Sequence, residues 1–459
     1  MKWRPWGTDA FARARAERKP ILLSIVAPWS IGCGEMDRVS FGDATTAALI
    51  NDRVVAIRVD ADFRPDIADR YDLGGLPTTA ILASDGTLLG GGTFVRPERL
   101  QAALLKAIAA GQVRIPSGDV RVDCRSAVAP AGTDTGSGAD DPALTELIFS
   151  SFDETNGGFG DAPKFPLTAP VRLALDLYAE HQSAGMRDRA VRTLDAMGWG
   201  PLYDEEHGGF YRCAGAADWT APHREKLLAT NAALLDLYLH AGVVLGDERW
   251  FARAVDLVQY INVALAASNG AWRASEDAEP GRQFSDGNAL AASAMLRAAG
   301  IFQDDALGKR ALDALERVLL ASYKPGHGVA HSAAGVRGLL ADQVAMAAAN
   351  LDAWESTGNV VYRMMAEELM HYALRTMWDG SGGGFFDRVD NPEEPPQPPL
   401  KPFVLNCEAA IVLRRIADAV GDRTFAARAV EALDATRGRA AAFGPLAAAS
   451  VVARRAVLR

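Results

Sequence analysis

The sequence has 459 residues, of which 49% are hydrophobic and 23% charged, with a formal net charge of −10. This length indicates two domains rather than one core, and the composition is that of a globular protein rather than a disordered one. The acidic balance, without any Lys/Arg run, excludes an electrostatic nucleic-acid surface. The chain begins without a signal-peptide pattern, and no window approaches the roughly 18 apolar residues of a membrane span, so we expect a cytoplasmic protein that meets no membrane.

The four cysteines are scattered along the chain and form no Cys-x-x-Cys pair; they are Cys33, Cys124, Cys213 and Cys407. This usage fits a reducing compartment and argues against structural zinc. We therefore expect no metal and no cofactor.

The first quarter of the chain alternates between strand and helix patterns. Apolar runs at 19–26 and 54–60 predict buried strands, and helical spacing over 34–52 predicts a helix between them. Residues 76–92 predict two strands around an Asp-Gly turn, and residues 96–108 predict a closing helix. This order, βαβ followed by ββα, predicts a parallel sheet with an appended hairpin.

The layout resembles the thioredoxin fold, with three features in register. The stretch from Trp29 to Cys33 follows the first strand, where thioredoxins carry their active-site loop, Pro77 stands where they carry a cis-proline, and Asp60 ends the neighbouring strand. More narrowly, "KPILLSI", "CGEMDRVSF", "VDADFRPDI" and "GGLP" resemble the YyaL, or spermatogenesis-associated, thioredoxin-domain family. Members of that family often carry Cys-His-Trp-Cys in the loop, whereas here Ser30 stands at the first cysteine.

Ser30 changes the chemistry expected of this loop. In a dithiol site the first cysteine supplies the attacking thiolate, and a serine hydroxyl without a neighbouring base cannot replace it. Cys33 alone can form a mixed disulfide or a reversibly oxidised adduct, but no disulfide within the domain. Two interpretations stay open: Cys33 is an inert, partly buried thiol in a redox-degenerate Ser-x-x-Cys module, or it has a monothiol or thiol-docking role.

A linker and a long repeat follow the thioredoxin-like domain, which we assign to residues 1–112. Residues 113–140 are rich in Gly, Pro, Ser, Thr and Asp and predict a linker. Over residues 141–459 a glycine-rich signature recurs every 51 to 62 residues, with its glycines at Gly157, Gly208, Gly270, Gly328, Gly383 and Gly444. A charged amphipathic helix precedes each signature and a mostly apolar helix follows it. Twelve such helices predict an all-α (α/α)6 barrel, apolar helices inside and amphipathic ones outside, with the glycine-rich loops at one mouth.

Polar residues that begin the inner helices are expected to ring a pocket at this mouth. His223 and Asn231 share one stripe of a predicted helix with Leu227 and Leu234, so both are expected to point inward. The candidate catalytic residues are His223, Glu276, Asp277, His331 and Asp342. The candidate substrate-binding residues are Lys164, Asp204, Trp219, Asn231, Asn288 and Asn406.

Structural alternatives accompany these candidates. Glu276 and Asp277 can brace their loop, and a buried amide such as that of Asn231 must be hydrogen-bonded to something. Eight aromatic residues at the mouth can stack on sugar rings or pack the loops; they are Phe159, Phe165, Phe210, Tyr211, Trp219, Trp272, Phe385 and Phe386.

The helical half carries resemblances of its own. "GGFGDAPKFP", "PHREKLL", "SEDA" and "GGGFFD" resemble barrel segments of the YyaL family, and the barrel resembles the six-hairpin glycosidase and sugar 2-epimerase folds. The second resemblance implies histidine acid–base chemistry, as in an epimerase, or two carboxylates across a glycosidic bond, as in a hydrolase. His223 with His327 or His331 suits the first chemistry. Glu276 or Asp277 with Asp342 suits the second.

Three functions are weighed. The favoured one is a protein of carbohydrate metabolism whose barrel binds or acts on a sugar-like metabolite, with isomerase/epimerase-like or glycosidase-like activity left open. The second is a thiol-dependent redox or thiol-docking protein that acts through Cys33, with a protein partner at the thioredoxin-like domain. The third is a non-catalytic interaction or regulatory protein, whose barrel mouth is plugged by its own side chains.

Overall fold

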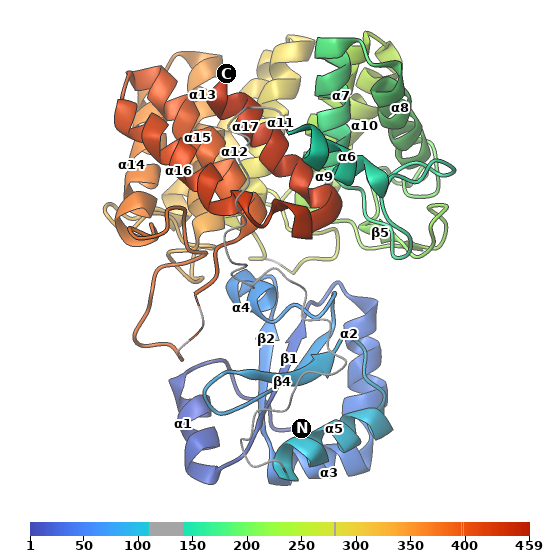
Figure 1. Ribbon diagram of the computed structural model, residues 1–459, viewed down its shortest axis with the longest axis vertical. Coiled ribbons are helices and arrows are strands. Elements are labelled where there is room, and N and C mark those ends of the chain that lie inside the picture. The colour runs from blue at the N-terminus through green and yellow to red at the C-terminus, as the bar shows by residue number, and fades with distance from the viewer. Residues whose placement is uncertain (110–140, 280, 396, 398) are drawn as a thin grey trace. The chain divides into compact units, whose positions relative to one another are not determined.

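The computed structural model describes residues 1–109, 141–279, 281–395, 397 and 399–459 (Figure 1). The chain divides into two compact units, Met1–Ser126 with Arg388–Leu400 and Ala127–Asp387 with Lys401–Arg459. The predicted linker at 113–140 and Cys124 lie outside the described residues.

A four-stranded sheet forms the centre of the first unit. Its strands are β1 Ile21–Val26, β2 Val55–Asp60, β3 Thr78–Leu82 and β4 Leu88–Gly92, in the order β2-β1-β3-β4. β1 and β2 are parallel, whereas β3 is antiparallel to both β1 and β4. The sequence predicted these strands and the appended hairpin, and the expected thioredoxin-like fold is confirmed.

Helices cover both faces of this sheet; they are α1 Thr8–Glu17, α2 Ile31–Met36, α3 Ala44–Arg53, α4 Pro65–Arg70 and α5 Pro97–Ala109. Successive strand residues enter opposite cores: Leu22 packs with the α3 and α5 side chains, and Leu23 with those of α1 and α4. The helix predicted over 34–52 is present but is interrupted. A π-helical turn, Asp37–Phe41, ends the first part, and Asp43 starts α3 because its carboxylate accepts the Thr46 backbone N–H at 2.7 Å.

The segment Arg388–Leu400 completes the first unit through a cluster of ion pairs. Arg64 Nε and Arg388 Nη1 lie 2.9 and 2.6 Å from the two carboxylate oxygens of Asp66, whose side chain is 1% exposed. Both guanidinium groups also reach Glu394 Oε2, at 2.8 and 2.9 Å. Burial opposes ionisation of Asp66, but Arg64 and Arg388 outweigh it and hold the pKa of this carboxyl below its ordinary value. No sequence pattern predicted that this segment belongs to the first unit.

The second unit is the expected barrel. Its twelve α-helices, among the residues that the structure describes, are α6 Pro142–Ser150, α7 Thr168–His181, α8 Ala184–Gly198, α9 Leu228–Leu245, α10 Glu248–Ala264, α11 Ser285–Phe302, α12 Asp305–Ser322, α13 Leu340–Thr357, α14 Val360–Thr376, α15 Phe403–Val420, α16 Arg423–Arg437 and α17 Ala448–Leu458. The inner helices α7, α9, α11, α13, α15 and α17 contact one another in that order, and α17 contacts α7 to close the ring (Figure 1). Five outer helices pack on the inner helix that precedes them, and α6 packs on α17 and on the 3-10 segment η2, Ala440–Ala447. The predicted (α/α)6 fold is confirmed.

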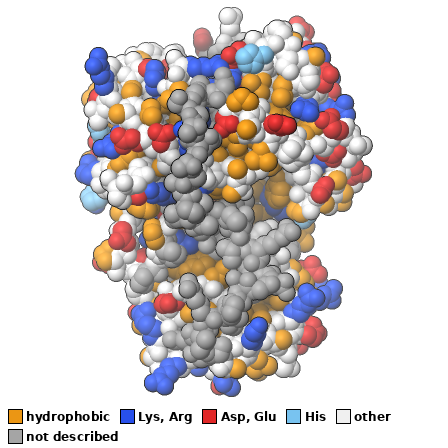
Figure 2. All heavy atoms as spheres, in the orientation of Figure 1, with side chains coloured by type: hydrophobic (Ala, Val, Ile, Leu, Met, Phe, Trp, Pro, Cys, Tyr) orange, Lys and Arg blue, Asp and Glu red, His pale blue; other side chains and the backbone are white. Residues whose placement is uncertain are grey.

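Two helical stretches, Leu228–Leu245 and Ala440–Leu458, match a membrane span in length and hydropathy, although the sequence led us to expect none. Both contribute to the inner ring. A helix surrounded by other helices is apolar on most sides, so this composition fits a core position. On the face shown in Figure 2, Lys and Arg side chains are interspersed with Asp and Glu.

Candidate functional site

Four inner helices hold the glycine-rich loops by the same amide contact. Asn231 accepts the Phe210 backbone N–H at 2.7 Å and donates to the Phe210 and Leu227 carbonyl oxygens at 3.1 and 2.9 Å. The fourth residue of α11, α13 and α15 makes the equivalent contact: Asn288 with Trp272, Gln343 with Val329, and Asn406 with Phe385. Backbone carbonyls consume both amide hydrogens of each side chain, which assigns the three predicted asparagines to holding the fold.

Lysine–aspartate ion pairs also hold these loops. The Nζ atom of Lys164, which is 0% exposed, lies 2.6 Å from Asp153 Oδ2 and donates to the Ala217 carbonyl at 2.7 Å. The equivalent pairs are Lys226 with Asp204 at 2.8 Å and Lys401 with Asp379 at 2.6 Å. Trp219 is buried and donates its indole N–H to the Asn156 carbonyl. The predicted binding residues Lys164, Asp204 and Trp219 are therefore engaged within the loops.

His223 does not lie on a helix, and the predicted helical stripe is wrong. α9 begins at Leu228, and His223 belongs to the short strand β6, Pro222–His223, which pairs with β5, Cys213–Ala214. The chain stays extended here because the Arg212 backbone N–H bonds the Glu225 carbonyl at 2.8 Å. The imidazole of His223 is exposed, with the Arg212 guanidinium 3.3 Å from its Nδ1 atom.

Two other candidate acids lie on the loop before α11. Glu276 is half-buried and accepts a hydrogen bond from Lys226 Nζ at 3.2 Å, so it shares Lys226 with Asp204. Asp277 is exposed. The structure brings neither of them to Asp342 among the contacts of the described residues.

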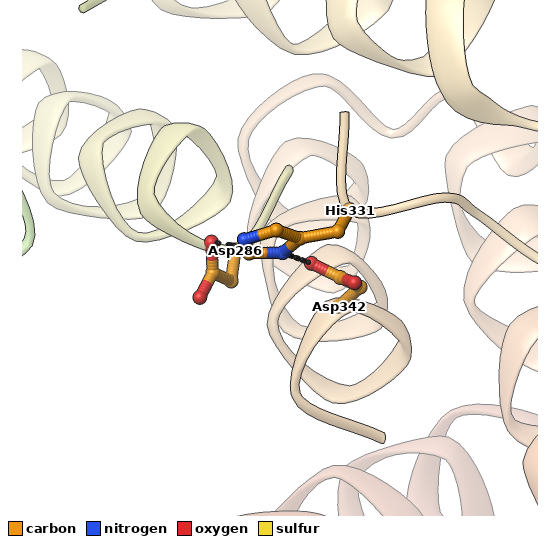
Figure 3. A group of neighbouring side chains, drawn as sticks. All are labelled: Asp286, His331 and Asp342. Carbon is orange, nitrogen blue, oxygen red and sulfur yellow. Dashed lines mark hydrogen bonds and ion pairs between the residues drawn. The ribbon is translucent and has the colours of Figure 1, made fainter. Parts of the chain in front are cut away.

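Three ionisable side chains meet where α11 and α13 begin. His331 Nδ1 lies 2.9 Å from Asp342 Oδ1 and 3.9 Å from Asp286 Oδ1. Figure 3 shows the imidazole between the two carboxylates, and its flat face stacks on Phe284 with ring centroids 4.7 Å apart. Since the ligand atoms of the three residues lie within 4.8 Å of one another, the cluster has the donors and the spacing to hold a proton or a cation.

The three residues of this cluster differ in their solvent exposure. Asp342 is 0% and His331 3% exposed, whereas the Asp286 side chain is 34% exposed and is the member that solvent reaches. Burial raises the pKa of Asp342 to about 6, against the opposing effect of His331. Asp342 Oδ2 has no hydrogen-bond partner among the described residues. A carboxyl that titrates near neutral pH beside an imidazole suits proton transfer.

The inward faces of the inner helices share one register. α9, α11, α13 and α15 each have 18 residues, and in each the second, sixth, ninth and thirteenth residues keep solvent exposure while most residues between them are buried. The sixth residues are Ala233, Leu290, Ala345 and Glu408. The thirteenth residues are His240, Arg297, Asp352 and Arg415. Asp286 is a second residue and so also lies on this face.

The thirteenth residues form a charged layer. Arg415 Nη2 lies 2.6 Å from Asp352 Oδ1, and Arg297 Nη2 lies 3.2 Å from His240 Nδ1. Asp236, one turn nearer the mouth, pairs with Arg297 Nη1 at 2.5 Å. Ion pairs thus join α9 to its neighbour α11, and α13 to its neighbour α15.

The Cys33 thiol in the thioredoxin-like loop is buried. Cys33 and Ser30 are each 5% exposed, and burial raises the pKa of the Cys33 thiol despite a hydrogen bond with Ser30. The Leu76–Pro77 peptide is cis, as the resemblance implied. A buried thiol with a raised pKa has little of the thiolate that attacks disulfides, so this geometry favours the inert interpretation.

The eight aromatic side chains divide between loop packing and exposure. Five of them are buried against the loops: Phe159, Phe210, Trp219, Trp272 and Phe385. Phe165 is 40% exposed, and Tyr211 and Phe386 are partly exposed. Only these three retain surface that can meet a ligand at this level of the described chain.

Comparison with known proteins places each half. Residues 1–112 match the Thioredox_DsbH family, described as a protein of unknown function, DUF255. Spermatogenesis-associated protein 20 of Mus musculus is 28% identical over 324 residues, which cover 61% of this chain and 39% of that protein. The chain thus spans about two fifths of the length of the curated relatives it matches.

Two solved structures share the barrel fold. Cellobiose 2-epimerase from Bacillus thermoamylovorans has a TM-score of 0.55 at 12% identity, over 63% of this chain and 82% of that one. A D-mannose isomerase has a TM-score of 0.55 at 13% identity, over 66% and 88%. At this identity the likeness shows the fold alone.

Proposed function

This chain belongs to the YyaL and spermatogenesis-associated protein family, and we propose that its barrel binds a carbohydrate or sugar-like metabolite and transfers protons on it, as an epimerase or isomerase does. The thioredoxin-like unit is then an accessory without dithiol chemistry. The proposal keeps the cytoplasmic location, and the absence of a nucleic-acid partner, that the composition predicts. One observation carries it: the Asp286–His331–Asp342 cluster at the start of α11 and α13.

The geometry of this cluster is that of an oriented acid–base group. A carboxyl group hydrogen-bonded to an imidazole nitrogen orients the ring, and Asp342 Oδ1 lies 2.9 Å from His331 Nδ1. Asp286 is the exposed member, so a ligand on the inward face meets its carboxylate first. General acid–base catalysis by such a group typically contributes about 10²–10⁴ in rate.

The surroundings and the fold support this substrate class. Apolar side chains alternate with acids on the inward face, which suits the apolar faces and hydroxyl groups of a sugar. Two neighbours in fold are named for converting sugars, a cellobiose 2-epimerase and a D-mannose isomerase. Likeness of fold supports a substrate class only by association, so the test must be direct.

Thermal unfolding with a panel of D-mannose, D-glucose, D-fructose and cellobiose tests the proposal. A bound sugar stabilises the folded chain by about 2.7 kcal/mol at 100 times its Kd, which raises Tm. The Asp286→Asn and His331→Ala variants should lose that rise. His223→Ala removes an exposed imidazole outside the cluster and should keep it. A panel without any shift, or shifts equal in all variants, contradicts the proposal.

A further inference from the structure

Glu408 is a carboxylic acid on the inward face that the sequence analysis did not single out. It is the sixth residue of α15 and lies two residues after Asn406, whose amide holds the loop at the mouth. The equivalent residues of α9, α11 and α13 are Ala233, Leu290 and Ala345, so the wall at this level is apolar on the three preceding helices.

The surroundings of Glu408 differ from those of the other inward acids. Asp236 pairs with Arg297 and Asp352 with Arg415. The described residues offer Glu408 neither a hydrogen bond nor an ion pair. Its side chain is exposed to solvent, yet burial raises its pKa to about 7. Glu408 is thus open to solvent, has no partner among the described residues, and by its place in the helical register lies on the inward face.

Several charged groups on neighbouring elements are paired with other residues, and so do not pair with Glu408. On its own helix Arg415 binds Asp352 and Glu355 of α13. On α17 Arg455 pairs with Glu180 of α7, and on α16 Arg428 pairs with Glu431. η2 contains no ionisable side chain. On α13, Asp342 is buried against His331.

We infer that Glu408 is a catalytic residue of the barrel, which donates a proton to an oxygen of the bound sugar-like ligand. This inference rests on the proposed function and gives it a second titratable group, on α15, beside the Asp286 cluster on α11. His331 and Asp342 are too buried to touch a ligand and act as positioning residues for Asp286.

The proposed step conserves protons and electrons. In a ring-open aldose, the Asp286 carboxylate takes the C2 proton, the C2–H electron pair becomes the C1–C2 double bond, and the carbonyl oxygen takes the Glu408 proton. The C2 hydroxyl of the enediol then gives its proton to Glu408 as the C2 carbonyl forms, and C1 receives the Asp286 proton on the face where it was removed. Both acids regain their starting states, and the product is the 2-ketose isomer. No other reactant is needed.

A first experiment needs no sugar. Dicyclohexylcarbodiimide reacts with a protonated carboxyl group: the acid proton moves to a reagent nitrogen, the carboxyl oxygen bonds the central carbon, and rearrangement gives an N-acylurea. Peptide mass spectrometry of the full-length protein should find this adduct on Glu408 at pH 6–7, with less at pH 8, and none at that position in Glu408→Gln. Glu355 of α13, which is paired with Arg415, is the control and should stay unlabelled. Absence of the adduct from Glu408, or equal labelling of Glu355, overturns the inference.

The second experiment separates the inference from the proposed function. NMR in D2O follows exchange of the C2 proton of the three aldoses in the panel, D-mannose, D-glucose and cellobiose. Wild-type protein should catalyse exchange, and Glu408→Gln should slow it by about 100-fold or more while the sugar-induced rise in Tm stays. Exchange at the wild-type rate in Glu408→Gln overturns the inference alone. Absence of both binding and exchange in the wild type overturns the proposed function, and the catalytic role of Glu408 with it.

Discussion

Asp342→Asn tests the cluster through the pH dependence of stability. The pKa of Asp342 rises from 3.8 to about 6 on folding, so the folded chain holds this proton more tightly than the unfolded chain does. Its stabilising effect is fully present below about pH 4 and is lost as the pH rises through about 6. Two pKa units correspond to about 3 kcal/mol. The asparagine does not titrate. We therefore expect the free energy of unfolding of the wild type, relative to Asp342→Asn, to fall by about 3 kcal/mol between pH 4 and 7.

Urea unfolding of both proteins across this range measures the difference. Any constant effect of the amide, such as an unpaired N–H, cancels when only the change with pH is compared. Asp277→Asn, at an exposed carboxyl, is the control and should show a flat difference. A flat difference for Asp342→Asn would refute the reasoning because folding would then leave the pKa of Asp342 unchanged, and a rising one because folding would then lower that pKa, as in an ion-paired carboxylate.

Other features of the chain are open to the same kind of test. Iodoacetamide at pH 7 should alkylate Cys33 at least about tenfold more slowly in the folded chain than in urea, since burial removes thiolate; equal rates speak against an inert thiol. Asn231→Ala should lower the free energy of urea unfolding by about 1–3 kcal/mol because the Phe210 backbone groups lose their partner; a change below about 0.5 kcal/mol contradicts that role. Arg388→Met should cost about 1.5–3 kcal/mol at pH 7, and less in acid once Asp66 is protonated, so urea curves that differ equally at pH 3 and pH 7 exclude the ion pair as the cause.

The barrel was predictable because its repeat is a backbone requirement. Gly208 and Gly209 have φ angles of +75° and +79°, and a Cβ on Gly209 would lie 2.5 Å from the Tyr260 ring. A side chain at that position would have a strained backbone and would clash with the Tyr260 ring, so such a turn requires glycine. The thioredoxin-like sheet was predictable for a similar reason, since its apolar strands alternate between two cores.

The site was less predictable because the role of a polar residue depends on its hydrogen-bond and ion-pair partners, which the sequence does not show. Asn231 and Glu408 both stand in apolar helical stretches, yet Asn231 bonds a loop backbone and Glu408 has no such partner among the described residues. His223 was misplaced because two paired residues, too few for a periodic pattern, hold it in β6. Among the candidate acids, Asp342 alone stands with His331 in the cluster, and that contact depends on how a loop crosses the start of α13.

The segment Arg388–Leu400 changes how the two units are joined. The polypeptide crosses between them three times, after Ser126, after Asp387 and after Leu400. A single protease cut between residues 110 and 140 would therefore not release the N-terminal fragment, because Asp66 would still be bound to Arg388 and Arg64 to Glu394. The two units are thus joined by three chain connections, not by one linker. Without residues 1–109, Arg388 would lose its contact with Asp66, and Glu394 its contact with Arg64.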